Sequence, residues 1–249
     1  NSEWISHGGT EGDLQVVSGQ ALVQHGSPSE DINLPFTSVT GELFFAFDMM
    51  IPDVGVPIGD GGTDFEYFAH FKDTGFGFVA QVDVVAPTGA GDYTVGISSD
   101  QNTADATWAT DLAYDTTYRV TVRYDQDTNI AELWVDAATQ GDTSILGADE
   151  TDPGDTVASF AFRQSDSSEN EGILVDNLVI AQTFAQTVLS TNDFETSEFS
   201  LYPNPTNLGY VNIESSKSDP INVQVFDILG KRIKNEGLIN NQLNVSNLN

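Results

Sequence analysis

The stretch TYRVTVRYDQDTNIAELWVD, residues 117–136, carries the clearest local signal for the fold. Apolar and polar residues alternate over residues 117–124 and again over 130–136, which is the period of a β-strand with one buried face. Between the two runs lie Asp125-Gln-Asp-Thr-Asn129, whose side chains can hydrogen-bond to their own backbone and tolerate left-handed geometry. The stretch therefore predicts a β-hairpin.

Alternating runs of the same kind recur through the first 190 residues, with turn residues between them. No window places apolar residues at i, i+3, i+4 and i+7 over three turns, so no long helix is expected. Besides the hairpin, the predicted strands span residues 21–23, 41–50, 65–72, 77–85, 93–98, 157–164 and 172–181. About nine strands without helices predict an all-β fold, an antiparallel sandwich of the jelly-roll type.

The charge of the chain restricts its partners. Its 249 residues include 38 acidic and 8 basic side chains, for a formal charge of −30, and no cysteine. Phosphate backbones and anionic membranes repel such a polyanion, so we expect no nucleic-acid partner. No apolar run approaches the roughly 20 residues that a membrane helix needs, so we expect no membrane span. Without disulfides, stability must come from an apolar core.

The same charge is divided unevenly along the chain. Residues 1–190 hold 31 acidic and 4 basic side chains, whereas residues 191–249 hold 7 and 4. The boundary falls in a Ser/Thr/acidic stretch with little periodicity, which we interpret as a linker. We therefore expect a first domain over residues 1–185, a linker over 186–198 and a small immunoglobulin-like β-sandwich over 199–249.

Three motifs of the first domain resemble laminin-G-like and concanavalin-like domains. The hairpin of residues 117–136 is similar to their strand, Asp-rich turn and "LYVDG" strand. GILVDNLVIAQ (172–182) resembles their closing strand, and WISHGGTEGDLQVVSGQALV (4–23) resembles their opening unit. The resemblance covers most of residues 1–185, and it implies a jelly-roll domain.

The tail resembles another family. FSLYPNPTNLGYVNIESSKSDPINVQVFDILGKRI (199–233) is similar to the type A sorting domain of the type IX secretion system of Bacteroidetes. The residues that match its motif are Tyr202, Pro203, Asn204, Pro205, Phe226, Asp227, Gly230 and Lys231. The resemblance implies an export signal that the outer-membrane translocon and its shuttle protein recognise. It also implies passage through the periplasm to the medium or the cell surface. Such domains usually continue into further strands, so we expect the last strands to be truncated.

A ligand-binding face is predicted around DFEYFAHFK, residues 64–72. Period-two alternation places Glu66, Phe68, His70 and Lys72 on one face and the neighbouring residues, Tyr67 included, on a core face. If the polar face lines a concave sheet, as the resemblance implies, it would meet Gln81, Arg123 and an exposed Trp134.

Two functions for the first domain remain open at this point. One is a non-catalytic module that binds glycans or surface partners, because no catalytic constellation stands out. The other is a polysaccharide lyase, in which Lys72, His70 and Arg123 would neutralise a uronate and move its α proton. A solvated sheet face with incidental ion pairs is the structural alternative to both.

Calcium is the expected ion, because hard oxygen ligands dominate the chain. Asp176 interrupts the apolar closing strand. The resemblance to concanavalin-like enzymes implies that Asp176 binds a structural calcium together with a group near the N-terminus, Asp13 or Glu3. The alternative is an outward-facing carboxylate at a strand edge.

Overall fold

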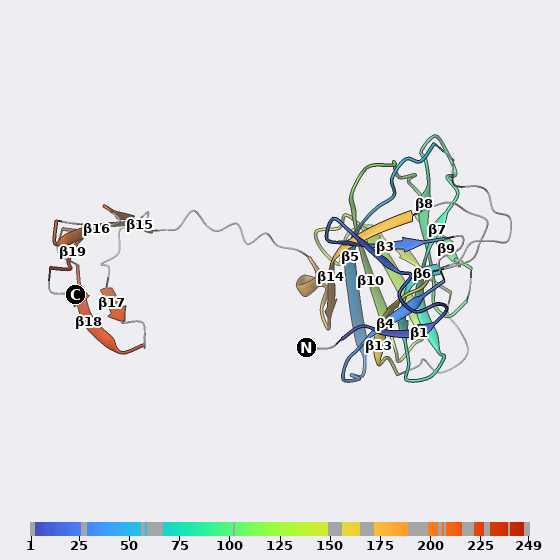
Figure 1. Cartoon of the computed structure of the whole chain (residues 1–249), viewed down its shortest axis with the longest axis horizontal. Helices are drawn as coiled ribbons and strands as arrows, with labels where there is room; N and C mark the ends of the chain where they lie inside the picture. The colour runs from blue at the N-terminus through green and yellow to red at the C-terminus, as the bar shows by residue number, and fades with distance from the viewer. Residues whose placement is uncertain are drawn as a thin grey trace. The chain divides into compact units, whose positions relative to one another are not determined.

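The computed structural model divides the chain into two compact units, residues 1–189 and 190–249 (Figure 1). The structure describes residues 3–25, 29–55, 58, 67–101, 103–148, 156–164, 172–188, 199–203, 206, 208–215, 222–226, 230–238 and 240–246. No helix in these ranges is long and apolar enough to cross a membrane.

The first unit is a sandwich of two seven-stranded antiparallel sheets, which confirms the predicted jelly-roll fold. Sheet A has the strand order β1 (Ile5–Gly8), β4 (Asp31–Pro35), β13 (Ser159–Phe162), β6 (Tyr67–Lys72), β7 (Phe78–Val85), β8 (Thr94–Ser98) and β9 (Ala106–Thr107). Sheet B has the order β12 (Ile145–Leu146), β11 (Ile130–Val135), β10 (Tyr118–Asp125), β5 (Glu42–Met50), β14 (Gly172–Ala181), β3 (Gln20–Gln24) and β2 (Gln15–Val17).

Aromatic rings from both sheets fill the space between them. Phe45 of β5 lies 4.8 Å from Phe71 of β6 and 5.0 Å from Phe160 of β13, measured between ring centroids, and all three side chains are fully buried. Edge-to-face contacts of this kind add to the free energy gained by burying the rings. The core therefore holds the sheets together without disulfides.

The hairpin predicted from residues 117–136 is present as β10 and β11, which pair from Val120↔Val135 to Asp125↔Ile130. Within its turn, the backbone N–H of Asp127 donates to Asp125 Oδ1 at 3.0 Å. Asn129 has a φ of 54° and accepts a hydrogen bond from the Tyr124 hydroxyl at 2.6 Å. The Asp-rich turn acts as its composition predicts.

One element covers the outer face of sheet B. The short helix α1 (Phe184–Thr187) follows β14, and with its flanking residues it forms what we call the strap, residues 183–188. The Phe184 ring lies 5.2 Å from the Trp134 ring and 6.4 Å from the Phe44 ring. Residues 186–188, which the sequence analysis assigns to the linker, therefore lie on the sandwich.

The second unit has a small β-structure. β15 (Phe199–Tyr202), β16 (Tyr210–Ser215) and β19 (Gln242–Asn244) form one sheet, and β17 (Asn222–Phe226) pairs with β18 (Arg232–Gly237). Among its described residues, Ile213 and Leu243 are the buried large hydrophobics. Leu201, Phe226 and Ile233 are each more than half exposed, so this unit presents apolar side chains on its surface.

Removing the Phe184 ring should destabilise the sandwich. Phe184→Ala would leave a cavity over Trp134 and Phe44, and we expect a loss of about 3 kcal/mol in the free energy of unfolding. Urea denaturation followed by tryptophan fluorescence measures this. The matched control is Phe76→Ala, because Phe76 is 83% exposed. Equal losses in the two variants would contradict a packing role for the strap.

Candidate functional site

The outer face of sheet A carries a group of polar side chains, most of which are almost fully buried. We call it the outer-face cluster: Tyr67, His70 and Lys72 of β6, Gln81 and Asp83 of β7, and the partly buried Arg163 after β13. The pairing of β6 with β7 shifts register between Tyr67 and Ala69 and again between Ala69 and Phe71.

These bulges change which side chains of β6 face the core. Phe68, Ala69 and Phe71 join the hydrophobic core, whereas the Tyr67 ring lies 5.1 Å from the His70 ring. The prediction that Tyr67 faces the core and Phe68 shares the polar face is therefore wrong. His70 and Lys72 lie on the same face of the sheet as Gln81.

His70 is neutral at physiological pH. Its Nδ1 lies 2.9 Å from the Phe71 carbonyl oxygen, which can only accept, so Nδ1 carries the hydrogen and Nε2 is an acceptor. Burial lowers the pKa of His70 to about 3, and the hydrogen bond to Phe71 opposes this only in part. His7, Arg163 and Lys72 lower the pKa further through their charges. The imidazole is therefore a fixed hydrogen-bonding group rather than a cation.

The turn between β6 and β7 is held by its own side chains. Asp73 Oδ1 accepts hydrogen bonds from the N–H groups of Gly75 at 2.7 Å and Gly77 at 2.9 Å. Lys72 Nζ donates to the carbonyl oxygens of Asp73, at 3.2 Å, and of Gly75. Lys72, which the sequence predicts to contact a ligand, therefore donates its hydrogen bonds within the turn.

This turn displays an exposed aromatic ring. The Phe76 side chain is 83% exposed, and Lys72 Nζ lies 5.8 Å from its ring centroid. Phe76 contacts Phe78 edge-to-face at 6.5 Å, and Phe78 contacts His70 at 4.8 Å. An aromatic row therefore runs from the solvent to the outer-face cluster. Sequence reasoning missed Phe76, although an apolar residue between two glycines of a turn was a visible signal.

Arg123 and Trp134 do not belong to this face. Both lie in sheet B, so the prediction that they meet His70 is wrong. Arg123 forms ion pairs with Glu42 at 2.7 Å and Glu132 at 2.8 Å. Trp134 is fully buried under the strap and cannot stack on a sugar. Glu66 lies outside the described residues, as do Asn204, Pro205 and Asp227 of the predicted export signal.

The remaining predicted tail residues lie on the second unit. The Tyr202 hydroxyl at the end of β15 donates a hydrogen bond to Glu214, which raises the pKa of Tyr202. Pro203 follows it directly. Gly230 has a φ of 80°, which favours glycine, and it precedes an exposed Lys231.

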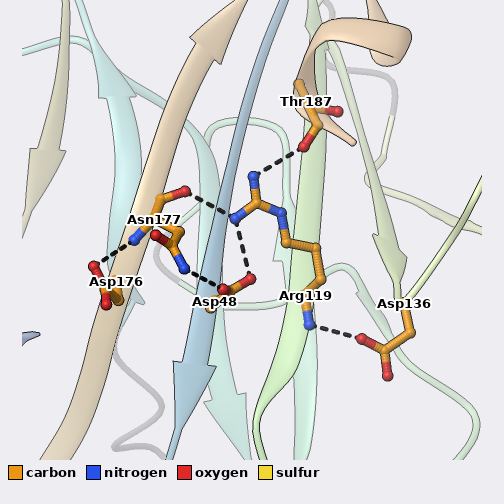
Figure 2. A network of polar contacts seen from close by, with 6 residues as sticks. All are labelled: Asp48, Arg119, Asp136, Asp176, Asn177 and Thr187. Carbon is orange, nitrogen blue, oxygen red and sulfur yellow. Dashed lines mark hydrogen bonds and ion pairs between the residues drawn. The ribbon is translucent and has the colours of Figure 1, made fainter. Parts of the chain in front are cut away.

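Asp176 lies in a network of polar contacts on the outer face of sheet B (Figure 2). It is in register with Asp48 of β5, and its Oδ1 accepts from the Asn177 N–H at 2.7 Å. Asn177, with a φ of 52°, donates its side-chain amide to Asp48 at 2.7 Å. Arg119 Nη1 donates to Asp48 at 3.1 Å and to the Asn177 carbonyl at 2.8 Å. Arg119 Nη2 donates to the Thr187 carbonyl at 2.9 Å, which ties the strap to the sheet.

Asp13 makes different contacts. Its Oδ2 accepts from the Ser29 N–H at 3.0 Å, and its Oδ1 accepts from the Glu30 N–H at 2.8 Å and from Gln164 Nε2 at 2.9 Å. Within the described ranges no three His, Asp or Glu side chains gather closely enough to hold a metal ion. Because N–H donors occupy both oxygens of Asp13, this carboxylate does not fit its predicted role as a calcium ligand.

Comparison with known proteins identifies the tail. Residues 200–249 match the family model described as the secretion system C-terminal sorting domain, which confirms the resemblance found in the sequence. A comparison with curated proteins found no match.

Solved structures resemble the sandwich at low identity. The carbohydrate recognition domain of Emp47p is 11% identical with a TM-score of 0.45, over 72% of this chain and 88% of that chain. A Lotus tetragonolobus seed lectin is 14% identical with a TM-score of 0.45, over 72% and 93%. The alginate lyase AlgAT5 is 13% identical with a TM-score of 0.44, over 70% and 84%. At these identities and TM-scores, nothing about the ligand or activity of this chain follows from the likeness.

The buried imidazole should make the sandwich sensitive to mild acid. An unfolded histidine titrates near its ordinary pKa of 6.5, whereas folded His70 has a pKa of about 3 and gains its second ring proton only near that pH. Below about pH 6.5 the unfolded state therefore binds a proton that the folded state does not bind. As the pH is lowered, the free energy of unfolding falls by up to about 1.4 kcal/mol for each pH unit. His70→Asn should flatten this fall between about pH 6.5 and 4.5, measured as melting temperature against pH. An NMR titration of the His70 ring with a midpoint near 6.5 would contradict the assignment.

Proposed function

We propose that this protein is an exported cargo of the type IX secretion system whose sandwich domain binds a glycan on the outer face of sheet A. The domain acts there as a non-catalytic module. The observation that carries the binding proposal is the Phe76 ring, which is 83% exposed on a turn fixed by Asp73 and Lys72.

The turn makes Phe76 suited to stacking on a sugar ring. A rigid aromatic side chain loses little conformational entropy on binding, and its face packs against the apolar face of a pyranose. The cluster beside it is closed to solvent, since His70 and Gln81 are each only 1% exposed. Gln81 is held there by hydrogen bonds to the Phe78 carbonyl at 3.0 Å and from Ser98 at 3.5 Å, so the exposed ring is the contact surface that we propose.

A neutral glycan is the preferred ligand class. The chain carries a formal charge of −30, which repels anionic polymers at long range. Screening over about 8 Å at physiological salt weakens this repulsion but leaves its sign unchanged.

A polysaccharide lyase is the second candidate. It is favoured by the position of His70, whose acceptor nitrogen lies on the same face as Lys72, Arg163 and Gln81. A pKa of about 3, however, makes His70 a weak base at neutral pH, and proton abstraction is fastest when the base titrates near the working pH. Binding without catalysis is therefore the first choice.

The second unit supplies the export signal in this proposal. The outer-membrane translocon and its shuttle protein would recognise it, and the mature protein would be secreted or held at the cell surface. The exposed Phe226 and the exposed Tyr202 offer apolar contact area for such a partner. The glycan-binding proposal does not require calcium, and Asp13, one of the residues predicted to bind it, accepts hydrogen bonds from Glu30 and Gln164.

Phe76→Ala should weaken glycan binding about tenfold, or about 1.4 kcal/mol, because the stacking surface is lost. Titration calorimetry of the full chain with neutral oligosaccharides of glucose, mannose and galactose measures this. The matched control is Leu146→Ala, which removes an equally apolar side chain, 55% exposed, from sheet B. A loss of affinity in both variants, or in neither, would overturn the assignment of the face. Release of unsaturated uronates from alginate, seen as ultraviolet absorbance, would favour the lyase instead.

Deletion of residues 200–249 should abolish export. In a host with the type IX machinery, the truncated protein should accumulate in the periplasm, while the full chain reaches the medium or cell surface. Immunoblots of the cell fractions measure this, with a periplasmic marker as the control for leakage. If the truncated protein still reached the outside, the tail would not be the export signal.

A further inference from the structure

A second polar cluster joins three segments at the edge of the sandwich, and it includes Asp13, one of the residues predicted to bind calcium. We call it the Asp13 cluster: Asp13, Glu30 and Gln164, with their hydrogen-bonding partners. Asp13 precedes β2, Glu30 precedes β4, and Gln164 follows β13. Glu30 is 6% exposed and Gln164 is 3% exposed, so both side chains lie inside the fold.

Two carboxylates meet in this cluster with few cations to balance them. The charge of Asp13 acts on Glu30 and raises its pKa, as burial does more strongly. The pKa of Glu30 nevertheless lies below its ordinary value, because the N–H groups of Leu14 and Gly12 and the Ser6 side chain donate to the carboxylate. The Leu14 bond is 3.0 Å long. Glu30 therefore stays ionised beside Asp13.

Gln164 connects both sheets through this cluster. Its Nε2 donates to Asp13 at 2.9 Å, and its Oε1 accepts from the N–H of Gln24 in β3 of sheet B at 3.1 Å. Its backbone N–H donates to Asp31 in β4 of sheet A at 3.0 Å. Both the nitrogen and the oxygen of the Gln164 side-chain amide are therefore hydrogen-bonded.

We propose that the Gln164 amide takes the place of a structural cation, so that this edge of the sandwich is stable without metal. A calcium ion would need the same carboxylate oxygens that now accept N–H bonds from Ser29, Glu30 and Gln164. Partial positive charge delivered by several N–H groups stabilises a carboxylate much as an ion does.

A single substitution tests this role, because the glutamine amide and the glutamate carboxylate differ only in replacing the NH2 group with an oxygen. Gln164→Glu keeps the shape of the side chain and replaces the donor nitrogen with a third charged acceptor beside Asp13 and Glu30. The repulsion should destabilise the fold in EDTA, and a cation should relieve it.

The experiment is a set of melting curves of the full chain in EDTA and in millimolar calcium at matched ionic strength. We expect the melting temperature of the wild type to be the same in EDTA and in calcium. We expect the same of the control Asp176→Asn. We expect Gln164→Glu to melt lower in EDTA and to gain several degrees in calcium, more than the wild type gains. Gln164→Ala should melt lower by the same amount in both media, because it loses hydrogen bonds without adding charge.

Two outcomes would overturn the proposal. One is a calcium stabilisation of the wild type that Asp13→Asn removes, because Asp13 would then bind the ion. The other is a Gln164→Glu variant that behaves as Gln164→Ala does, without any response to calcium. A wild-type response that survives Asp13→Asn places the ion elsewhere and agrees with a metal-free cluster. The wild-type and Asp13→Asn comparison applies even if Gln164→Glu does not fold.

Discussion

The structure depends on one interaction above all, the hydrogen bond from a backbone N–H to a carboxylate. In the described part of the sandwich, at least thirteen acidic side chains accept such a bond: Asp13, Glu30, Asp31, Asp53, Asp73, Asp92, Asp105, Asp111, Asp115, Asp125, Asp136, Asp142 and Asp176. Asp111 alone accepts from the N–H groups of Thr88, Gly89 and Gly91, and these bonds keep its pKa below the ordinary value. In a chain without cysteine, the acidic composition therefore orders the loops that disulfides would otherwise constrain.

This interaction also positions the two places on which the proposals rest. The Asp73 carboxylate closes the turn that presents Phe76, so the exposed ring is held before any ligand arrives. The Asp13 carboxylate joins a loop of each sheet to Gln164. On the outer face of sheet B the roles of side chain and backbone are exchanged, because the Arg119 guanidinium donates to the backbone carbonyls of Asn177 and Thr187. Fixed loops at both faces give the sandwich a preorganised surface.

The sequence could predict the sandwich because its central strands are long enough to leave a signal, either alternation, as in β10, or a run of apolar residues, as in β5 and β14. It could not predict β2, β9 or β12, since edge strands of two or three residues leave no period to detect. The bulges in β6 changed the face of Tyr67, and a four-residue helix buried Trp134. The donors to Asp13 and Asp111 lie 16 to 23 residues away or farther, so no local pattern distinguishes these side chains from solvated acids.

The strand β14 comes late in the sequence but lies in the interior of sheet B. β14 lies between β5 and β3 in sheet B, yet it is the last strand of the sandwich to leave the ribosome. Until residues 172–181 emerge, β5 and β3 have no common neighbour, and the long-range pairs that close the sheet cannot form. The sheet can therefore close only once residues 172–181 are free to pair with both neighbours. A chain without them would leave open edges on β5 and β3, and unpaired strand edges of this kind promote aggregation.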